Sequence, residues 1–132
     1  MSDHIIISIN AGARNEKTYG AFAVIHNGKI RPIDPVKAGV SVGDDKIARM
    51  DEFKGLTTSN QAGYAALVYA ARYAHRVQQA SPKPLTFTFR MPNNLVVKQV
   101  SGEWNCKDVE LQGLREHALK FLNTLRFSIT KS

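Results

Sequence analysis

The chain has 132 residues, of which 43% are hydrophobic and 22% are charged. This is the ordinary composition of one globular domain, and it excludes a disordered tail, a collagen-like fibre and a disulfide-rich mini-protein. Cys106 is the only cysteine and can form no internal disulfide, which is typical of a reducing compartment, so we expect a cytoplasmic protein. No apolar run approaches the roughly 18 residues that span a bilayer, so we expect no membrane partner.

Lysine and arginine number 18 against 11 aspartate and glutamate, which gives a net charge of +7. Such an excess attracts polyanions, of which nucleic acid is the commonest in cells. A basic surface that only aids solubility is about equally compatible with this composition. The cations are spread along the chain, so any binding patch must be assembled by the fold.

The first third of the chain predicts an antiparallel meander. Residues 5–9 form a β-branched apolar run typical of a buried strand, and a polar loop is expected over 10–18. Residues 19–25 predict a second strand, which the Asn27-Gly28 turn connects to a third strand within 30–42. The prolines early in that third segment confine its beginning to a sheet edge or a loop.

The middle of the chain predicts a surface insertion followed by a long helix. Residues 43–57 are polar and charged, with room for one helical turn over 47–53. Thr58 or Ser59 is expected to cap a helix that runs to about Gln79. Apolar residues recur along it at helical spacing: Leu67, Ala70, Ala71, Ala74 and Val77.

The last third predicts a strand over 85–89, a short helix over 94–100, a helix over 108–125 and a final strand over 126–130. The order βββαβααβ indicates an α/β (mixed α+β) fold, in which helices pack on a mixed five-stranded sheet. We expect residues 1–132 to form a single domain. The expected core is Ile7, Ile9, Phe22, Val24, Leu67, Ala71, Phe87, Leu114, Phe121 and Leu122.

Four sequence patches in this order resemble the type I ribonuclease H family. Residues 10–14 (NAGAR) resemble the Asp-Gly-Ala-Ser-Arg that ends the family's first strand, and residues 58–67 (TSNQAGYAAL) resemble the Thr-Asn-Asn-x-Ala-Glu-x-x-Ala-Leu that opens its long helix. Residues 92–102 (PNNLVVKQVSG) resemble its Asp-Ser-x-Leu-Val-Val segment with the Gln and Gly that follow, and Trp104 precedes a helix similar to its last long helix. The resemblance covers nearly the whole chain except 43–57, and it implies a ribonuclease H-like fold.

The departures from the family pattern concern its chemistry. Family enzymes hold two divalent metals with four carboxylates, but the first three positions are Asn10, Gly63 and Pro92 here. The fourth would follow the last predicted strand, after Ser132. The resemblance therefore implies a protein that is not an enzyme and holds no metal or other cofactor.

Two other sources of catalytic chemistry are weak in this sequence. The acids of the insertion, Asp44, Asp45, Asp51 and Glu52, could replace the lost ligands, but a solvated acidic loop is the favoured interpretation, because metal sites need rigidly oriented ligands. The histidines have no metal-ligand spacing, and no glycine-rich phosphate loop occurs.

Two surfaces are candidates for nucleic-acid binding. On the long helix, Tyr69, Arg72, Tyr73 and Arg76 share one face, where arginines suit phosphates and tyrosines suit bases, unless the tyrosines instead pack on the sheet. The second surface follows from the resemblance, because family enzymes touch the nucleic-acid backbone and 2′-hydroxyls with amides at the helix start. Its residues are Arg14, Lys17, Ser59, Asn60, Gln61, Asn93 and Asn94. Helix capping is an equally supported role for Asn60.

These observations favour a non-catalytic nucleic-acid-binding protein that prefers RNA, single-stranded or duplex, largely without sequence specificity, with DNA as a further partner. The alternative is a protein-interaction or structural module that reuses the fold, for example as a homo-oligomer. An active metal-dependent nuclease with relocated ligands is the least favoured interpretation.

Overall fold

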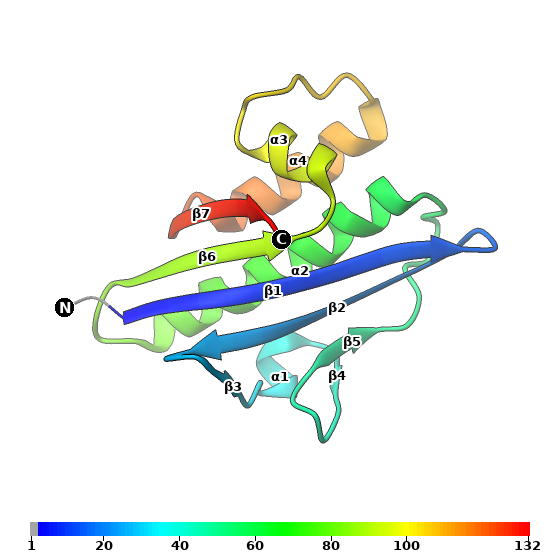
Figure 1. Cartoon of the computed structure of the whole chain (residues 1–132). Coiled ribbons are helices and arrows are strands. Elements are labelled where there is room, and N and C mark those ends of the chain that lie inside the picture. Colours follow the sequence, from blue (N-terminus) through cyan, green and yellow to red (C-terminus); the bar gives the residue numbers. More distant parts are fainter. Residues whose placement is uncertain (1–2) are drawn as a thin grey trace.

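The computed structural model describes residues 3–132. Its strands form one sheet with the order β4-β5-β2-β1-β6-β7, and β3 also pairs with β2 (Figure 1). The strands are β1 (Asp3–Arg14), β2 (Lys17–His26), β3 (Lys29–Arg31), β4 (Ser41–Val42), β5 (Ala48–Met50), β6 (Leu85–Met91) and β7 (Arg126–Lys131). The helices are α1 (Pro35–Ala38), α2 (Ser59–Ala80), α3 (Asn94–Val100) and α4 (Val109–Leu122).

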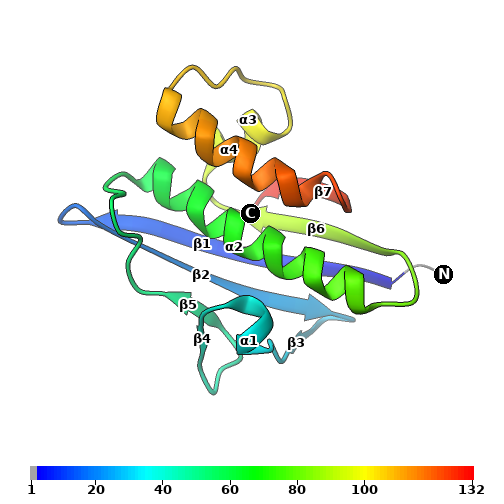
Figure 2. The same cartoon turned by 180° about the vertical axis from the view of Figure 1, so that it is seen from behind.

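The long strand β1 lies at the centre of the sheet. It pairs antiparallel with β2 and parallel with β6, which in turn pairs parallel with β7. The helices α1, α2 and α4 lie on one face of this sheet, behind the strands in Figure 1 and in front of them in Figure 2. The mixed α/β fold and the packing of helices on a mixed sheet confirm the prediction.

A capping box begins α2. The Thr58 side chain accepts a hydrogen bond from the Gln61 backbone nitrogen at 3.2 Å, and Gln61 Oε1 accepts one from the Thr58 backbone nitrogen at 3.1 Å. Gly20 of β2 then allows α2 to approach closely, because a Cβ at Gly20 would lie 2.9 Å from the Cβ of Ala66. These contacts fix the helix start over one end of the sheet.

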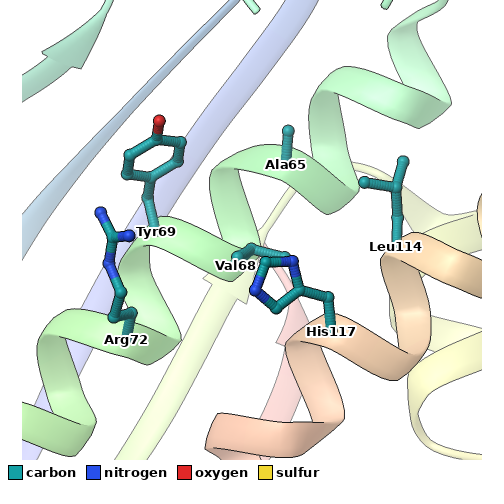
Figure 3. A pocket seen from close by; sticks show the side chains of 6 residues that line it. All are labelled: Ala65, Val68, Tyr69, Arg72, Leu114 and His117. Atoms are coloured by element: carbon teal, nitrogen blue, oxygen red, sulfur yellow. The ribbon is translucent and has the colours of Figure 1, made fainter.

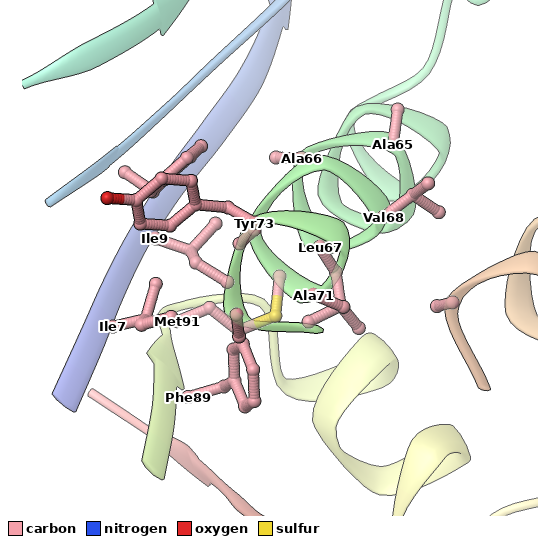
Figure 4. Packing of buried hydrophobic residues seen from close by; sticks show 14 of the residues in the cluster. Ile7, Ile9, Ala65, Ala66, Leu67, Val68, Ala71, Tyr73, Phe89 and Met91 are labelled. Carbon is pink, nitrogen blue, oxygen red and sulfur yellow. The ribbon is translucent and has the colours of Figure 1, made fainter. Parts of the chain in front are cut away.

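The core lies between α2 and the inner sheet face (Figure 4). Eight of the ten expected core residues are buried, from Ile7 and Ile9 on β1 to Leu122 on α4. Leu114 and Phe121 are only partly buried, because α4 covers the side of α2 and leaves these two side chains at the edge of the core.

The expected strand count was wrong: the sheet has seven strands rather than five. One additional strand is β5, which lies within the segment 43–57 and pairs with β2. That segment is therefore part of the sheet rather than a surface insertion, and Met50 and Phe53 are buried in the core. The other arises because α1, capped by Asp34, divides the expected third strand into β3 and β4.

The expected loop over 10–18 is also replaced by regular structure. β1 and β2 continue to a two-residue turn at Asn15 and Glu16, whose φ angles are 52° and 62°. Two positive φ angles characterise the type I′ turn, whose twist matches that of the flanking strands. Within residues 3–132, none of the helices is both long and apolar enough to cross a membrane.

Candidate nucleic-acid interface

The first three family-motif positions converge at one end of the sheet. The parallel register of β1 and β6 pairs Ser8 with Arg90, so its continuation places Asn10 level with Pro92. Gly63 faces the same region from α2, because a Cβ there would lie 3.2 Å from Asn93 Nδ2. We call this end of the sheet the amide pole.

An amide pair joins two elements at the amide pole. Asn93 Nδ2 donates a hydrogen bond to Asn60 Oδ1 at 3.1 Å, and Asn93 Oδ1 accepts one from the Val96 backbone nitrogen at 3.1 Å. Asn93 thus caps α3 while it fixes the orientation of Asn60. The Nδ2 group of Asn60 makes no hydrogen bond with another described residue, so it is available as a donor to a ligand.

The capping alternative for Asn60 is therefore wrong, because Thr58 caps α2. Ser59 is exposed beside the cap, and Asn94 is half-buried in the first turn of α3. The sequence indicates only one half of this pair. Asn93 precedes an apolar run, as a helix cap does, but nothing in the sequence points to Asn60 as its partner, 33 residues away.

Gln61 does not face a ligand. It is only 7% exposed, and its side-chain oxygen accepts hydrogen bonds from the Thr57 and Thr58 backbone nitrogens at 2.9 and 3.1 Å. Its side-chain nitrogen donates to Glu110 on the helix α4. The expected binding role of Gln61 is thus corrected to a structural one, which the Thr-x-x-Gln pattern of a capping box could have indicated.

The β1–β2 hairpin places a pair of cations beside an aromatic ring. Arg14 and Lys17 are cross-strand partners and both are exposed. Tyr19 is 48% exposed, and its ring lies against Gly12, where a Cβ would be 2.6 Å from the tyrosine hydroxyl. Sequence reasoning missed Tyr19, because Gly12 lies in the segment expected to be a loop and the two residues become cross-strand partners only in the folded hairpin.

The face on α2 that sequence spacing suggested is mostly engaged within the protein. Tyr73 is 6% exposed and its ring centroid lies 5.8 Å from that of Phe22, so it cannot stack on a base. Tyr69 is partly buried, with its ring centroid 5.9 Å from that of Phe53. The binding role expected of Tyr73 is therefore corrected to core packing.

The two arginines of this α2 face contact α1. Arg72 lies over the Tyr69 ring, 4.9 Å from its centroid, and reaches the Ala38 carbonyl at 3.5 Å. Arg76 donates to the Lys37 carbonyl at 2.6 Å. Arg72 and Tyr69 also line a shallow pocket between α2 and α4, together with His117 (Figure 3).

A buried polar network supports the helices near the amide pole. Tyr64 donates to Gln99 Oε1 at 2.7 Å, Gln99 Nε2 donates to the Asn105 carbonyl at 3.3 Å, and Arg115 donates to the Gln99 carbonyl at 3.0 Å. Burial raises the pKa of Tyr64 well above its ordinary value. The network joins α2, α3 and α4, and sequence spacing gave no signal for it.

No protein-family model matches the sequence, and no curated protein matches it either. Solved structures do resemble it. The N-terminal ribonuclease H domain of a Mycobacterium tuberculosis protein has a TM-score of 0.75 at 18% identity, over 99% of this chain and 83% of that one. The ribonuclease H1 of the halophilic archaeon Halobacterium salinarum has a TM-score of 0.71 at 22% identity, over 98% of this chain and 85% of that one.

A third similar structure, ribonuclease H1 LC11 from compost, was solved with an RNA/DNA hybrid. Its TM-score is 0.71 at 18% identity, over 97% of this chain and 84% of that one. The chain has a ribonuclease H-like fold. This finding confirms the fold that the four sequence patches implied.

The residues that this ribonuclease H-like fold brings to the amide pole do not fit the two-metal site of the family. Asn10 offers a neutral amide whose oxygen accepts a hydrogen bond from the Ala11 backbone nitrogen at 3.0 Å. Asn93 Nδ2 and Val96 Cγ2 lie 3.2 Å from the Cβ that a carboxylate residue would carry in place of Gly63. Within residues 3–132, no group of three or more His, Cys, Asp or Glu residues is placed to hold a metal ion.

Proposed function

We propose that this protein binds nucleic acid, with a preference for RNA, and does not cleave it. The observation that carries the proposal is the Asn60–Asn93 pair at the amide pole. The pair holds Asn60 in one orientation, and its Nδ2 group has no hydrogen-bond partner within residues 3–132, so little side-chain entropy is lost when a ligand accepts its hydrogen bond.

The preference for RNA follows from the chemistry of this donor. A 2′-hydroxyl accepts and donates hydrogen bonds, and DNA lacks it. The Nδ2 group of Asn60 can donate to a 2′-hydroxyl oxygen or to a phosphate oxygen, and only the first of these contacts distinguishes RNA from DNA. The exposed hydroxyl of Ser59 on the same helix turn offers a second polar contact.

Electrostatics support the binding of a polyanion at this pole. Asn10, Gly63 and Pro92 carry no charge, so the phosphates of a ligand meet no carboxylate at these three positions. Two like unit charges 4 Å apart repel each other by about 4 kcal/mol at the effective dielectric of a protein surface. The loss of a carboxylate beside a phosphate therefore removes a large unfavourable energy. The net charge of +7 acts in the same direction at longer range.

The similar LC11 structure, solved with an RNA/DNA hybrid, supports the choice of nucleic acid as the partner. The absence of cleavage is proposed because an amide, a glycine and a proline cannot replace three carboxylate ligands.

The proposal is tested with labelled single-stranded RNA, double-stranded RNA, an RNA/DNA hybrid and DNA of the same sequence, each at two salt concentrations. We expect salt-sensitive binding with RNA bound more tightly than DNA, and an intact hybrid after incubation with magnesium or manganese. Binding that is absent at micromolar protein would contradict the proposal. Metal-dependent cleavage that is lost in Asp44→Asn or Asp51→Asn would instead identify an active nuclease with relocated ligands.

The exposed edge of the sheet favours a second candidate, an interaction module that forms a homo-oligomer. β7 is the last strand in the sheet order, and its outward-facing residues are exposed, so its free edge can pair with another strand. Sedimentation of the purified protein separates the two candidates, because this one predicts an oligomer without salt-sensitive RNA binding.

A further inference from the structure

The sheet face opposite α2 is not covered by any helix of residues 3–132 (Figures 1 and 2). Burial alternates along the strands, so that Ile7 and Ile9 are buried under α2 while Ser8 and Asn10 point to the other side. We call the outward-facing positions of β1, β2, β6 and β7 the open face.

The open face is cationic. None of its described positions is aspartate or glutamate, whereas four are basic: Arg14, Lys17, Arg90 and Arg126. A fifth outward-facing cation, Arg49 on the neighbouring strand β5, is neutralised by Asp45 at 2.6 Å. The unpaired positive charge is therefore concentrated on the central and β7 side of the sheet.

These cations follow a diagonal across three strands. In the strand register, Arg126 of β7 is level with Thr86, and Arg90 of β6 is level with Ser8. Arg14 lies six residues further along β1 than Ser8. At about 3.3 Å per residue, the path from the level of Arg126 to Arg14 measures roughly 33 Å, long enough for several nucleotides.

The charge of Arg90 is not used inside the protein. Its Nε atom is buried without a hydrogen-bond partner among the described residues, and its register neighbours are Ser8 and Thr130, neither of which is charged. An arginine at the centre of a sheet with no carboxylate beside it costs desolvation energy. A phosphate that binds there would offset that cost.

Polar and aromatic groups accompany the diagonal. His4 Nε2 and Thr88 Oγ1 are 2.8 Å apart, and Thr88 Oγ1 and Ser128 Oγ are 3.1 Å apart, so hydroxyl groups line the path. At its hairpin end, the half-exposed side chain of Tyr19 contacts Gly12, two residues from Arg14. Cations with an exposed aromatic ring on a sheet surface are the elements that bind single-stranded nucleic acid.

We infer that a single strand of nucleic acid binds along the open face, with Arg126, Arg90 and Arg14 on its phosphates and Tyr19 stacked on a base. This inference rests on the proposed function and extends the contact from the amide pole across the sheet. A second copy of the chain is a poorer occupant, because two such faces would bring like charges together without carboxylates to pair them.

The test compares variants of equal net charge. The double variant Arg90→Gln, Arg126→Gln removes two cations of the open face. The control double variant Lys83→Gln, Lys120→Gln removes two exposed cations, one from the loop before β6 and one from α4. The probe is a labelled uridine oligonucleotide of about 16 nucleotides. We expect the open-face variant to bind at least tenfold more weakly than the control, with a log–log salt slope reduced by about 1.4, or 0.7 for each lost phosphate contact.

Two single variants keep the test decisive if Arg90→Gln alters folding. Arg126→Gln changes an exposed residue on the sheet edge and is expected to reduce the salt slope by about 0.7. Tyr19→Leu is expected to weaken binding about tenfold with an unchanged salt slope, since a stacking contact neutralises no phosphate.

The outcomes separate this inference from the proposed function. If the wild-type protein binds RNA and Asn60→Ala weakens that binding, but the open-face variants match the control, the inference is overturned and the proposed function stands. If the wild-type protein shows no salt-sensitive binding, both fall. Dimers that dissociate in the Arg126→Gln variant would overturn the inference in favour of a second copy on this face.

Discussion

The side chains of Asn60 and Asn93 are joined by a hydrogen bond of 3.1 Å that connects the first turn of α2 to the cap of α3. The bond uses the oxygen of Asn60 and leaves its nitrogen for a ligand. One amide thus orients another at the end of the sheet where the family motif has carboxylates.

This geometry predicts a selective effect of Asn60→Ala. Loss of one hydrogen bond costs about 1 kcal/mol of binding free energy, so we expect RNA affinity to fall roughly five- to tenfold. DNA affinity should fall less, because only RNA offers a 2′-hydroxyl. Fluorescence anisotropy with RNA and DNA of one sequence measures the difference. The control is Asn123→Ala, at the C-terminal cap of α4. An equal loss of affinity for RNA and DNA in Asn60→Ala would argue against the 2′-hydroxyl contact.

Gly20 and Gly113 are predicted to respond in opposite directions to alanine. A Cβ at Gly20 would lie 2.9 Å from Ala66 Cβ and 3.0 Å from Phe53 Cζ, so Gly20→Ala should lower the free energy of unfolding by about 1–3 kcal/mol. Gly113 lies in the exposed middle of α4 with no atom within 4 Å of an added Cβ, so Gly113→Ala should raise it by about 1 kcal/mol through helix propensity. Urea unfolding of both variants measures the two effects, and a stable Gly20→Ala protein would mean that α2 can shift away from β2.

Phe87 is predicted to be one of the most sensitive core positions. It is 2% exposed on β6, next to the ring of Phe89, so Phe87→Ala should cost about 3–5 kcal/mol by opening a cavity under α2. The matched change Phe127→Ala, on the edge strand and only partly buried, should cost less. A loss below about 1 kcal/mol at Phe87 would contradict its placement in the core.

The sequence predicted the fold best where periodicity is long. Apolar residues recur at helical spacing along α2, where Leu67 and Ala71 are buried, and buried residues alternate with half-buried ones along β6. Both patterns arise because one side of each element faces the core. The three-residue strand β5 carries too few residues for such a pattern, and its pairing with β2 is a tertiary contact. Periodicity alone therefore predicted a surface insertion for the segment 43–57 that contains β5.

The candidate site was only partly predictable for a related reason. α2 packs on the sheet while α1 and α4 lie along its sides, so more than one of its faces is covered. Spacing alone left two roles open for Tyr73, contact with a base or packing within the protein, and the structure shows that it packs on Phe22. The Asn60–Asn93 contact and the Gly12–Tyr19 contact depend on strand register and helix placement, which a single sequence does not specify.

Tyr64 predicts how stability depends on alkaline pH. Burial raises the pKa of its hydroxyl above the ordinary value of 10, and the hydroxyl donates to Gln99 Oε1 at 2.7 Å. The unfolded chain releases this proton near pH 10 while the folded protein retains it, so this contribution to stability is complete below about pH 10 and falls as the pH rises further. Tyr64→Phe removes that pH dependence together with the hydrogen bond.

At neutral pH, Tyr64→Phe should lower the free energy of unfolding by about 1–3 kcal/mol, because Gln99 is buried and its side-chain oxygen loses its donor. The difference in free energy of unfolding between wild type and variant should then shrink at about pH 11. At that pH the wild-type protein has lost part of the stabilisation by Tyr64, whereas the variant has no such contribution. Urea unfolding at about pH 7 and about pH 11 measures both values. Tyr19→Phe, at an exposed position, is the control and should change stability by less than about 0.5 kcal/mol. A wild-type minus Tyr64→Phe difference that stays constant between the two pH values would show that Tyr64 ionises as readily in the folded protein as in the unfolded chain.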